Sequence, residues 1–300
     1  MSTWKKWASS ALVRRNYFVR EEILFNIRQF FRAEKFHEVE TPVVRPYLIP
    51  ESYYEYFETL LLDRNRKRKK AWLSPSPESS LKKLLSAGFG NCFEITKCFR
   101  NTETQSNMHN PEFTLLEWYE VDADYSDSME LLQKLILNLF SNLKNKGLIK
   151  GNQNFLHYKN FKIDINAWEK ISMPEAFKKY AKLDLNLTIN PEGKTRDDIF
   201  NSKIIGPIAL KKGYSVNKKN TWEEIFNQIY LNEVEPNLGI KHPVIIYDFP
   251  APMAALAKMK KGSNIYAERF ELYIANLELA DCYTELTDWK EQEKRMNEEL

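Results

Sequence analysis

Two runs of alternating polar and apolar residues, 91–99 and 112–121, stand on either side of a polar loop at residues 101–110. A period of two predicts β-strands, so we expect an antiparallel pair of strands here. In the second strand the alternation places four side chains on one face: Phe113, Leu115, Glu117 and Tyr119. A glutamate that is buried among apolar side chains needs a cation or hydrogen-bond donors. The hairpin therefore predicts a sheet that carries a polar site.

The other periodic segments predict both helices and strands. Helical spacing of apolar residues indicates helices over 19–34 and 126–146, and short β-type runs indicate strands at 244–249, 268–275 and 279–286. Strands gather towards both ends of the chain, helices lie between them, and few β–α–β alternations occur. We therefore expect an α+β fold with an antiparallel or mixed sheet flanked by helices.

The charge balance and the cysteine content exclude several classes of protein. The 300 residues include 44 basic and 41 acidic ones, a net charge of +3, whereas a general nucleic-acid-binding protein is expected to be strongly basic. The three cysteines form no CxxC pair, which argues against a zinc site or a disulfide framework and favours a cytoplasmic location. No apolar run approaches the roughly 18 residues that a membrane span needs.

A basic run at residues 64–70 follows the strand expected at 54–62. Runs of like charge are often solvated, and the first interpretation is an exposed hairpin loop. The second interpretation is a patch that docks an acidic partner. The sequence leaves both interpretations open.

The loop between the two strands brings binding groups together. Arg100 leaves the first strand and Phe113 enters the second, with His109 and Asn110 just before it. A guanidinium can hold a phosphate or a carboxylate with two hydrogen bonds, and an aromatic ring can stack on a base. The alternative is a surface hairpin whose aromatic side chains belong to the core.

A second group of carboxylates lies on the strand pair near the end of the chain. Glu271 and Glu278 could share a divalent cation through their oxygen atoms. The alternative is a set of surface carboxylates in salt bridges. Upstream of both groups, Ser76-Pro77-Glu78 is a strong helix start, with a capping serine, a proline suited to the first turn and an acid at the positive end of the helix dipole.

These strings resemble class II aminoacyl-tRNA synthetases, and among them the lysyl branch. Phe99-Arg100-Asn101 with the segment 109–113 is similar to motif 2, the segment 30–42 is similar to motif 1, the dimer element, and the segment 269–288 is similar to the metal and substrate segment. The strings 76–78 and 116–119 also resemble a stand-alone branch of the family, the elongation factor P–(R)-β-lysine ligases. The resemblance covers roughly residues 20–300.

The resemblance implies a role for each matching residue. Arg100 is the expected catalytic residue, which holds the α-phosphate and the substrate carboxylate. The expected ATP-binding residues are Arg100, Asn101, Glu103, His109, Asn110, Phe113, Glu271 and Leu272, and Glu271 and Glu278 are expected to bind Mg²⁺. The expected substrate-binding residues are Ser76, Pro77, Glu78, Glu117, Tyr119, Glu278 and Glu285.

The implied activity is ATP-dependent activation of lysine or (R)-β-lysine as an aminoacyl-adenylate, followed by transfer to a lysine of elongation factor P. The implied organisation is an N-terminal extension, residues 1–18, and a catalytic domain, residues 19–300, with a small, mostly helical insertion at 150–235. The implied partners are elongation factor P and a second copy of the chain, whereas neither tRNA nor a membrane is expected.

The sequence departs from the family pattern at three places. Thr102 stands where the family usually has Glu, and Asp281-Cys282 replaces the usual Asn-Gly. No segment matches motif 3, a glycine-rich strand followed by a helix with an ATP-binding Arg. Two alternative functions are therefore kept: an impaired or truncated paralogue that senses nucleotides or amino acids, and a tRNA-charging enzyme without an anticodon domain.

Overall fold

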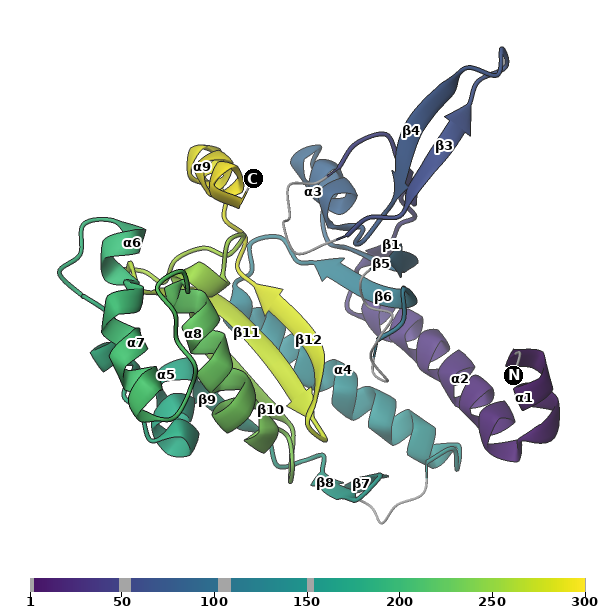
Figure 1. The fold of residues 1–300 in the computed structure, drawn as a ribbon. Helices are drawn as coiled ribbons and strands as arrows, with labels where there is room; N and C mark the ends of the chain where they lie inside the picture. The colour runs from purple at the N-terminus through teal and green to yellow at the C-terminus, as the bar shows by residue number, and fades with distance from the viewer. Residues whose placement is uncertain (1–2, 49–54, 102–108, 150–153, 300) are drawn as a thin grey trace. The chain divides into compact units, whose positions relative to one another are not determined.

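The computed structural model describes residues 3–48, 55–101, 109–149 and 154–299. The chain forms two compact units, which are described separately (Figure 1). The first unit comprises residues 1–122 and 293–300, and the second comprises residues 123–292. No helix within the described ranges is both long enough and apolar enough to cross a membrane.

The first unit is built on a long helix and two small sheets. Its elements are α1 (Thr3–Ser9), α2 (Ala11–Ala33), β1 (His37–Glu38), β2 (Val44–Arg45), β3 (Glu58–Leu62), β4 (Arg68–Leu73), α3 (Glu78–Ser86), β5 (Cys92–Phe99) and β6 (Glu112–Tyr119). One sheet has the order β1-β5-β6, with β1 parallel and β6 antiparallel to β5. The other has the order β2-β4-β3 and is antiparallel.

Aromatic side chains hold α2 against the first of these sheets. Phe31 is fully buried and stacks on Phe93 of β5, with 4.8 Å between the ring centroids. Its ring also lies 5.6 Å from Trp118 of β6 and 5.1 Å from Phe36. This packing fixes β5 and β6, which carry the motif 2 residues.

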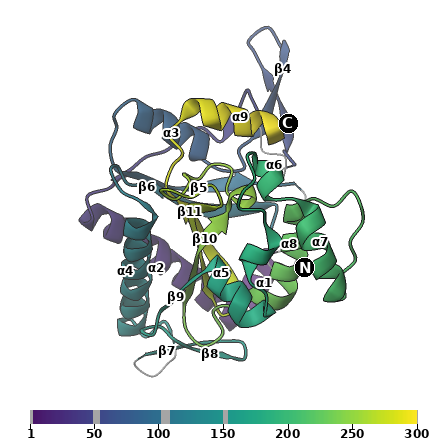
Figure 2. The ribbon, with the colours of Figure 1, turned by 90° about the vertical axis from the view of Figure 1, so that its left-hand side faces the viewer.

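The second unit contains a four-stranded sheet between helices. Its main elements are α4 (Tyr125–Asn145), β7 (Phe155–Tyr158), β8 (Phe161–Asp164), β9 (Glu169–Ser172), α5 (Met173–Ala176), α6 (Arg196–Ile199), α7 (Ser202–Lys211), α8 (Trp222–Ile229), β10 (Val244–Pro250), β11 (Tyr266–Ile274) and β12 (Leu277–Tyr283). The sheet order is β12-β11-β10-β9. Figure 2 shows β9–β11 between α4 on one side and α5, α7 and α8 on the other. A last helix, α9 (Trp289–Glu299), runs from the second unit into the first.

The core of the second unit lies between its sheet and the helices α5–α8. Phe177 and Phe226 stack with their centroids 4.7 Å apart, and Phe226 also stacks on Trp222 at 5.0 Å. Ile246 of β10 and Tyr273 of β11 belong to the same buried cluster. This cluster supports the strands from which the second group of carboxylates arises.

The structure confirms the α+β class and most of the expected helices and strands. Several of these elements begin or end at other residues than expected. The helix expected over 19–34 begins at Ala11, because Ser10 caps it: the Ser10 hydroxyl accepts a hydrogen bond from the backbone of Val13. This helix crosses the boundary at residue 18 between the expected extension and domain, and that division stays a prediction. The expected insertion, 150–235, contributes β7–β9 before its helices.

Candidate active site

Arg100 and Phe113 lie side by side at the open end of the β5–β6 pair. Cys98 is in register with Phe113, and the backbone N–H of Arg100 donates to the carbonyl of Pro111. The guanidinium carbon of Arg100 lies 5.1 Å from the centroid of the Phe113 ring, a cation–π contact. Its Nε atom also donates to the carbonyl oxygen of Pro75 at 3.4 Å. A positive group for a phosphate and a flat ring for a base are therefore neighbours.

Glu117 is a half-buried carboxylate held by two hydroxyl groups. The Tyr119 hydroxyl donates to Oε1 at 2.8 Å, and the Ser76 hydroxyl donates to Oε2 at 2.9 Å. Burial, followed by the nearby charge of Glu78, raises the pKa of Glu117 to about 7, although both hydrogen bonds lower it. Near neutral pH the side chain is therefore partly protonated, and a cationic ligand would favour its ionised form.

Ser76 links Glu117 to Glu78 at the start of α3. The Ser76 hydroxyl accepts a hydrogen bond from the backbone N–H of Glu78 at 3.0 Å while it donates to Glu117. α3 begins at Glu78 with Pro77 at its N-cap, one residue later than the cap expected at Ser76, and the Ser76 hydroxyl joins the hydrogen bonds of Glu117 instead. Because Pro75 accepts a hydrogen bond from Arg100 and Ser76 donates one to Glu117, two consecutive residues connect the guanidinium and the carboxyl group.

Two cations in this region were not found from the sequence. Lys82, one helical turn after Glu78, forms an ion pair with it at 2.5 Å. Arg45 of β2 is buried, and it donates to the Ser76 carbonyl at 2.9 Å and to the Ser79 hydroxyl at 2.5 Å. The spacing of four residues could have revealed Lys82. Nothing in the local sequence separates Arg45 from a surface arginine.

The loop between β5 and β6, which the resemblance places in ATP binding, is described only at its ends. The backbone N–H of Asn101 donates to the carbonyl of Glu55 at 2.9 Å, whereas His109 and Asn110 are exposed at the other end. Glu103, which the resemblance places in ATP binding, lies outside the described residues, and so does Thr102. Pro77 occupies the N-cap position of α3.

The second unit gathers charged groups on β11 and β12. Arg269 donates to Glu271 at 2.7 Å and to both oxygens of Asp281 at 2.8 and 3.1 Å. The second oxygen of Glu271 accepts a hydrogen bond from the Tyr273 hydroxyl at 2.8 Å. Burial and the carboxylates of Glu278 and Asp281 raise the pKa of Glu271 above its usual range, against the opposing charge of Arg269.

This set of side chains fits a divalent cation that is also held by phosphates. Glu271, Glu278 and Asp281 supply three carboxylates against the single guanidinium of Arg269. Each carboxylate oxygen of Glu271 accepts one hydrogen bond and keeps a second lone pair for a ligand. Within the described ranges, no three His, Cys, Asp or Glu side chains are arranged as a metal site. Magnesium bound by one or two carboxylates plus substrate phosphates needs no such cluster.

The two remaining expected residues of this segment differ in their surroundings. The Leu272 side chain is fully buried, and Leu272 pairs with Ile245 of β10 and Ala280 of β12, so its part in ATP binding stays a prediction. Glu285 follows β12, forms a β-bridge with Ala257 and is partly buried. Its charge also helps to raise the pKa of Cys282 to about 12, after burial as the main cause.

Comparison with known proteins gives the class of this chain. The family model described as tRNA synthetases class II (D, K and N) matches residues 6–300. The chain therefore belongs to the class II tRNA synthetase family, as the motif 2 string indicated.

Individual relatives show which members of this family the chain is similar to. The chain is 33% identical over 293 residues to the elongation factor P–(R)-β-lysine ligase of Buchnera aphidicola subsp. Schizaphis graminum, an alignment that covers 97% of this chain and 80% of the relative. It is 33% identical to the homologue of that ligase in Aquifex aeolicus, over 95% of this chain and 81% of the relative. It is 32% identical to the lysine–tRNA ligase of Wigglesworthia glossinidia brevipalpis, over 96% of this chain and 54% of the relative.

Proposed function

We propose that this protein activates lysine or (R)-β-lysine with ATP and transfers the activated group to a lysine side chain of elongation factor P in the cytoplasm. The ligase names of its relatives support the acceptor. The observation that carries the proposal is the half-buried carboxyl group of Glu117 in the same hairpin as the Arg100–Phe113 pair. One side of this arrangement suits an ammonium group, and the other suits a nucleotide.

The proposed reaction has two steps. The substrate carboxylate attacks the α-phosphorus of ATP, which forms an aminoacyl-adenylate and releases pyrophosphate. The amine of the acceptor lysine then attacks the carbonyl carbon and releases AMP. Magnesium, when bound, would neutralise charge on the phosphates, and Glu271 and Glu278 are the side chains that would hold it.

The protein side chains act mainly by positioning and charge. Arg100 would hold the α-phosphate and the attacking carboxylate in line, and Phe113 would stack on adenine. Glu78 would receive the amino group near the carboxylate, and for this its ion pair with Lys82 has to open. Glu117, hydrogen-bonded by Tyr119, would receive the distal ammonium, and Glu285 is proposed to do the same.

The molecule that receives the activated amino acid, elongation factor P or tRNA, distinguishes this proposal from its alternatives. Purified protein is incubated with ATP, labelled lysine or (R)-β-lysine, elongation factor P and tRNA. We expect label on the factor and none on the tRNA. Labelled tRNA would instead support a tRNA-charging enzyme. ATP binding without amino-acid-dependent pyrophosphate exchange would support a sensing paralogue.

Glu285→Gln is expected to weaken the preference for a cationic side chain. The neutral amide removes a charge that an ammonium group would meet, so the ratio of kcat/KM for lysine to that for norleucine should fall about 10- to 100-fold. Pyrophosphate exchange with the two amino acids measures this ratio. Glu192→Gln, at an exposed site in the second unit, should leave it unchanged. An unchanged ratio in Glu285→Gln would remove Glu285 from the proposed pocket.

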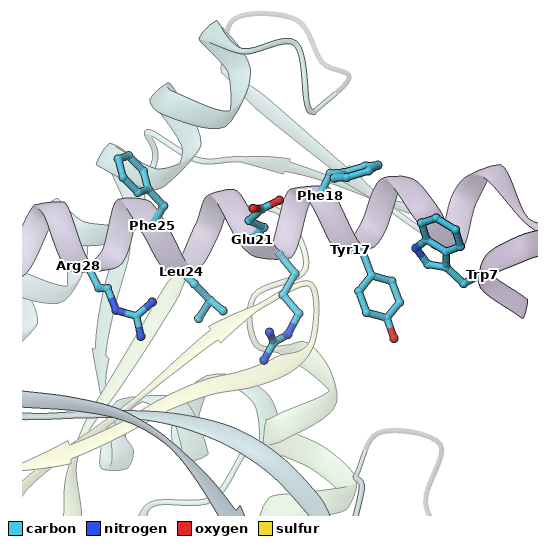
Figure 3. Close-up of a pocket in the computed structure, with 8 residues that line it drawn as sticks. Trp7, Tyr17, Phe18, Glu21, Leu24, Phe25 and Arg28 are labelled. Carbon is cyan, nitrogen blue, oxygen red and sulfur yellow. The ribbon is translucent and has the colours of Figure 1, made fainter. Parts of the chain in front are cut away.

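We also propose that the protein is a homodimer and that the exposed face of α1 and α2 forms the contact. Figure 3 shows aromatic side chains along this face, around a pocket of about 570 Å³. The pocket is lined by Trp7, Tyr17, Phe18, Arg20, Glu21, Leu24, Phe25 and Arg28. Large exposed apolar patches mark protein contacts, and two-fold dimers are the commonest symmetric assembly.

A double charge substitution tests this contact. Phe18 and Phe25 are 56% and 52% exposed, and Phe18→Glu with Phe25→Glu should convert the protein to a monomer in analytical ultracentrifugation. Leu187→Glu, at a site that is 66% exposed in the second unit, is the matched control and should leave the dimer intact. A wild-type protein that sediments as a monomer at micromolar concentration would contradict the proposal.

A further inference from the structure

The hairpin formed by β3 and β4, called here the basic hairpin (residues 58–73), is exposed along most of its length. Figure 1 shows it as a two-stranded ribbon that projects from its unit. Ala71, near its base, is fully buried, whereas residues 60–70 are all exposed. β4 pairs with β2 only through residues 72 and 73. The outer part of the ribbon therefore offers both of its faces and both of its edges to solvent.

The basic hairpin concentrates most of the excess positive charge of the chain. Residues 58–70 contain six basic and two acidic residues. Their net charge of +4 exceeds the net charge of +3 of all 300 residues. Glu58 pairs with Lys70 at 3.0 Å, and both side chains are largely exposed. Among the described residues, no ion pair involves the other five cations. These are Arg64, Arg66, Lys67, Arg68 and Lys69.

Asp63, the second acidic residue of the hairpin, stabilises the turn through backbone hydrogen bonds. The Asp63 carboxylate accepts hydrogen bonds from the backbone N–H groups of Asn65 and Lys67 at 2.9 and 2.8 Å. Backbone hydrogen bonds from Arg66 to Asp63 and from Asp63 to Lys67 close the same turn. The cations are therefore presented on an ordered tip, which lowers the entropy cost of binding a partner.

Exposed leucines lie directly opposite the cations. Leu60 is in register with Lys70 and Leu62 with Arg68, and opposite residues of an antiparallel pair share a face. The two leucines are 49% and 57% exposed. The outer ribbon, residues 59–70, has no aromatic side chain on which a base could stack. An aliphatic strip with a cationic border fits a protein surface better than a nucleic acid.

We propose that the basic hairpin is the docking element for the acceptor protein and that it binds an acidic surface of that protein beside an apolar patch. The proposal rests on the proposed function, since the acceptor of the second step is a protein. Electrostatic attraction by such a patch would mainly speed the encounter and would weaken with salt. The leucines would supply the contact that persists at high salt.

Charge reversal and leucine replacement test the two parts of this surface. Arg64→Glu, Arg68→Glu and Lys69→Glu in one chain should lower kcat/KM for transfer to elongation factor P about 10- to 100-fold at low salt. Added salt should no longer slow transfer in this variant and should instead speed it, because the reversed hairpin repels an acidic surface and salt screens that repulsion. Leu60→Asn with Leu62→Asn should lower kcat/KM about 10-fold and keep the salt dependence. Lysine-dependent pyrophosphate exchange should stay at the wild-type rate in both variants.

The matched control reverses three exposed lysines of the second unit, Lys211, Lys218 and Lys219. It changes the net charge by the same amount and should leave transfer unchanged. Equal transfer rates in the charge-reversed hairpin and in this control would overturn the docking proposal alone. Loss of tRNA binding with normal transfer would also overturn it, in favour of a nucleic-acid contact. If wild-type protein labels no factor at all, the proposed function fails and the docking proposal fails with it.

Discussion

Arg100→Ala should abolish adenylate formation while the protein stays folded. The guanidinium lies beside Phe113 and supplies two parallel donors for a phosphate or a carboxylate, which no other side chain of the hairpin provides. Loss of such a group at a transferring phosphoryl centre costs about 1,000-fold or more in rate. Lysine-dependent pyrophosphate exchange measures this rate directly, without the acceptor protein.

Arg100→Lys separates charge from geometry in the same test. A lysine keeps the positive charge but loses the planar fork, so we expect an intermediate rate, still at least 10-fold below wild type. Near-ultraviolet circular dichroism and the thermal midpoint should match the wild type in both variants, because Arg100 is partly exposed and follows β5 at its end, outside the apolar core. Exchange in Arg100→Ala at the wild-type rate would remove Arg100 from the chemistry.

Glu117→Gln should raise the KM for lysine about 100-fold at pH 8, because a charge-assisted contact with the ammonium is lost. The pKa of about 7 also predicts a pH profile. In the wild type, kcat/KM for lysine should rise about 10-fold per pH unit below pH 7 and level off above it, since only the ionised carboxylate attracts the ammonium. The profile of Glu117→Gln should be flat over this range.

The raised pKa of Glu117 also affects stability: kcat/KM should rise with pH, whereas the free energy of unfolding should fall. Between about pH 4.5 and 7 the folded state keeps a proton on Glu117 that the unfolded state has lost, so the free energy of unfolding falls as pH rises. Relative to Glu117→Gln, the wild type should lose up to about 3 kcal/mol over this interval. Urea unfolding at several pH values measures the difference. Parallel stability curves for the two proteins would contradict the burial of this charge.

Glu112→Gln is the matched control for both measurements. Glu112 lies on the same strand, but its side chain is 55% exposed and pairs with Lys97 at 2.8 Å on the surface. Its substitution should change neither the pH profile of kcat/KM nor the pH dependence of stability. A shift of similar size in Glu112→Gln would show that the effect does not come from the Glu117 site.

The sequence was sufficient for the parts of the fold that depend on periodicity. The alternation in β6 placed Glu117 and Tyr119 on one face, and the regular register with β5 confirms it. The helix expected from Ser76-Pro77-Glu78 is present, but Pro77 and not Ser76 is its N-cap. The strand β1 is only two residues long, and beyond it Thr41 binds the Glu94 carboxylate through its N–H and hydroxyl groups. That long-range contact leaves no local signal.

The parts of the candidate site that were missed depend on tertiary packing. Arg45 reads as an ordinary polar residue in the sequence, and only the arrangement of β2 against the start of α3 buries it. Arg269 was noted as part of a string, but its role as a shared partner of Glu271 and Asp281 follows from the register of β11 with β12. Asp281 thus supplies a carboxylate to a guanidinium that is only 16% exposed.

A crystal structure with a non-hydrolysable lysyl-adenylate analogue tests the account most directly. We expect the adenine on Phe113, the linker that replaces the phosphate within hydrogen-bond distance of Arg100, and the distal ammonium within hydrogen-bond distance of Glu117. An analogue bound elsewhere, with these three side chains free of it, would contradict the assignment of this hairpin as the site of amino-acid activation.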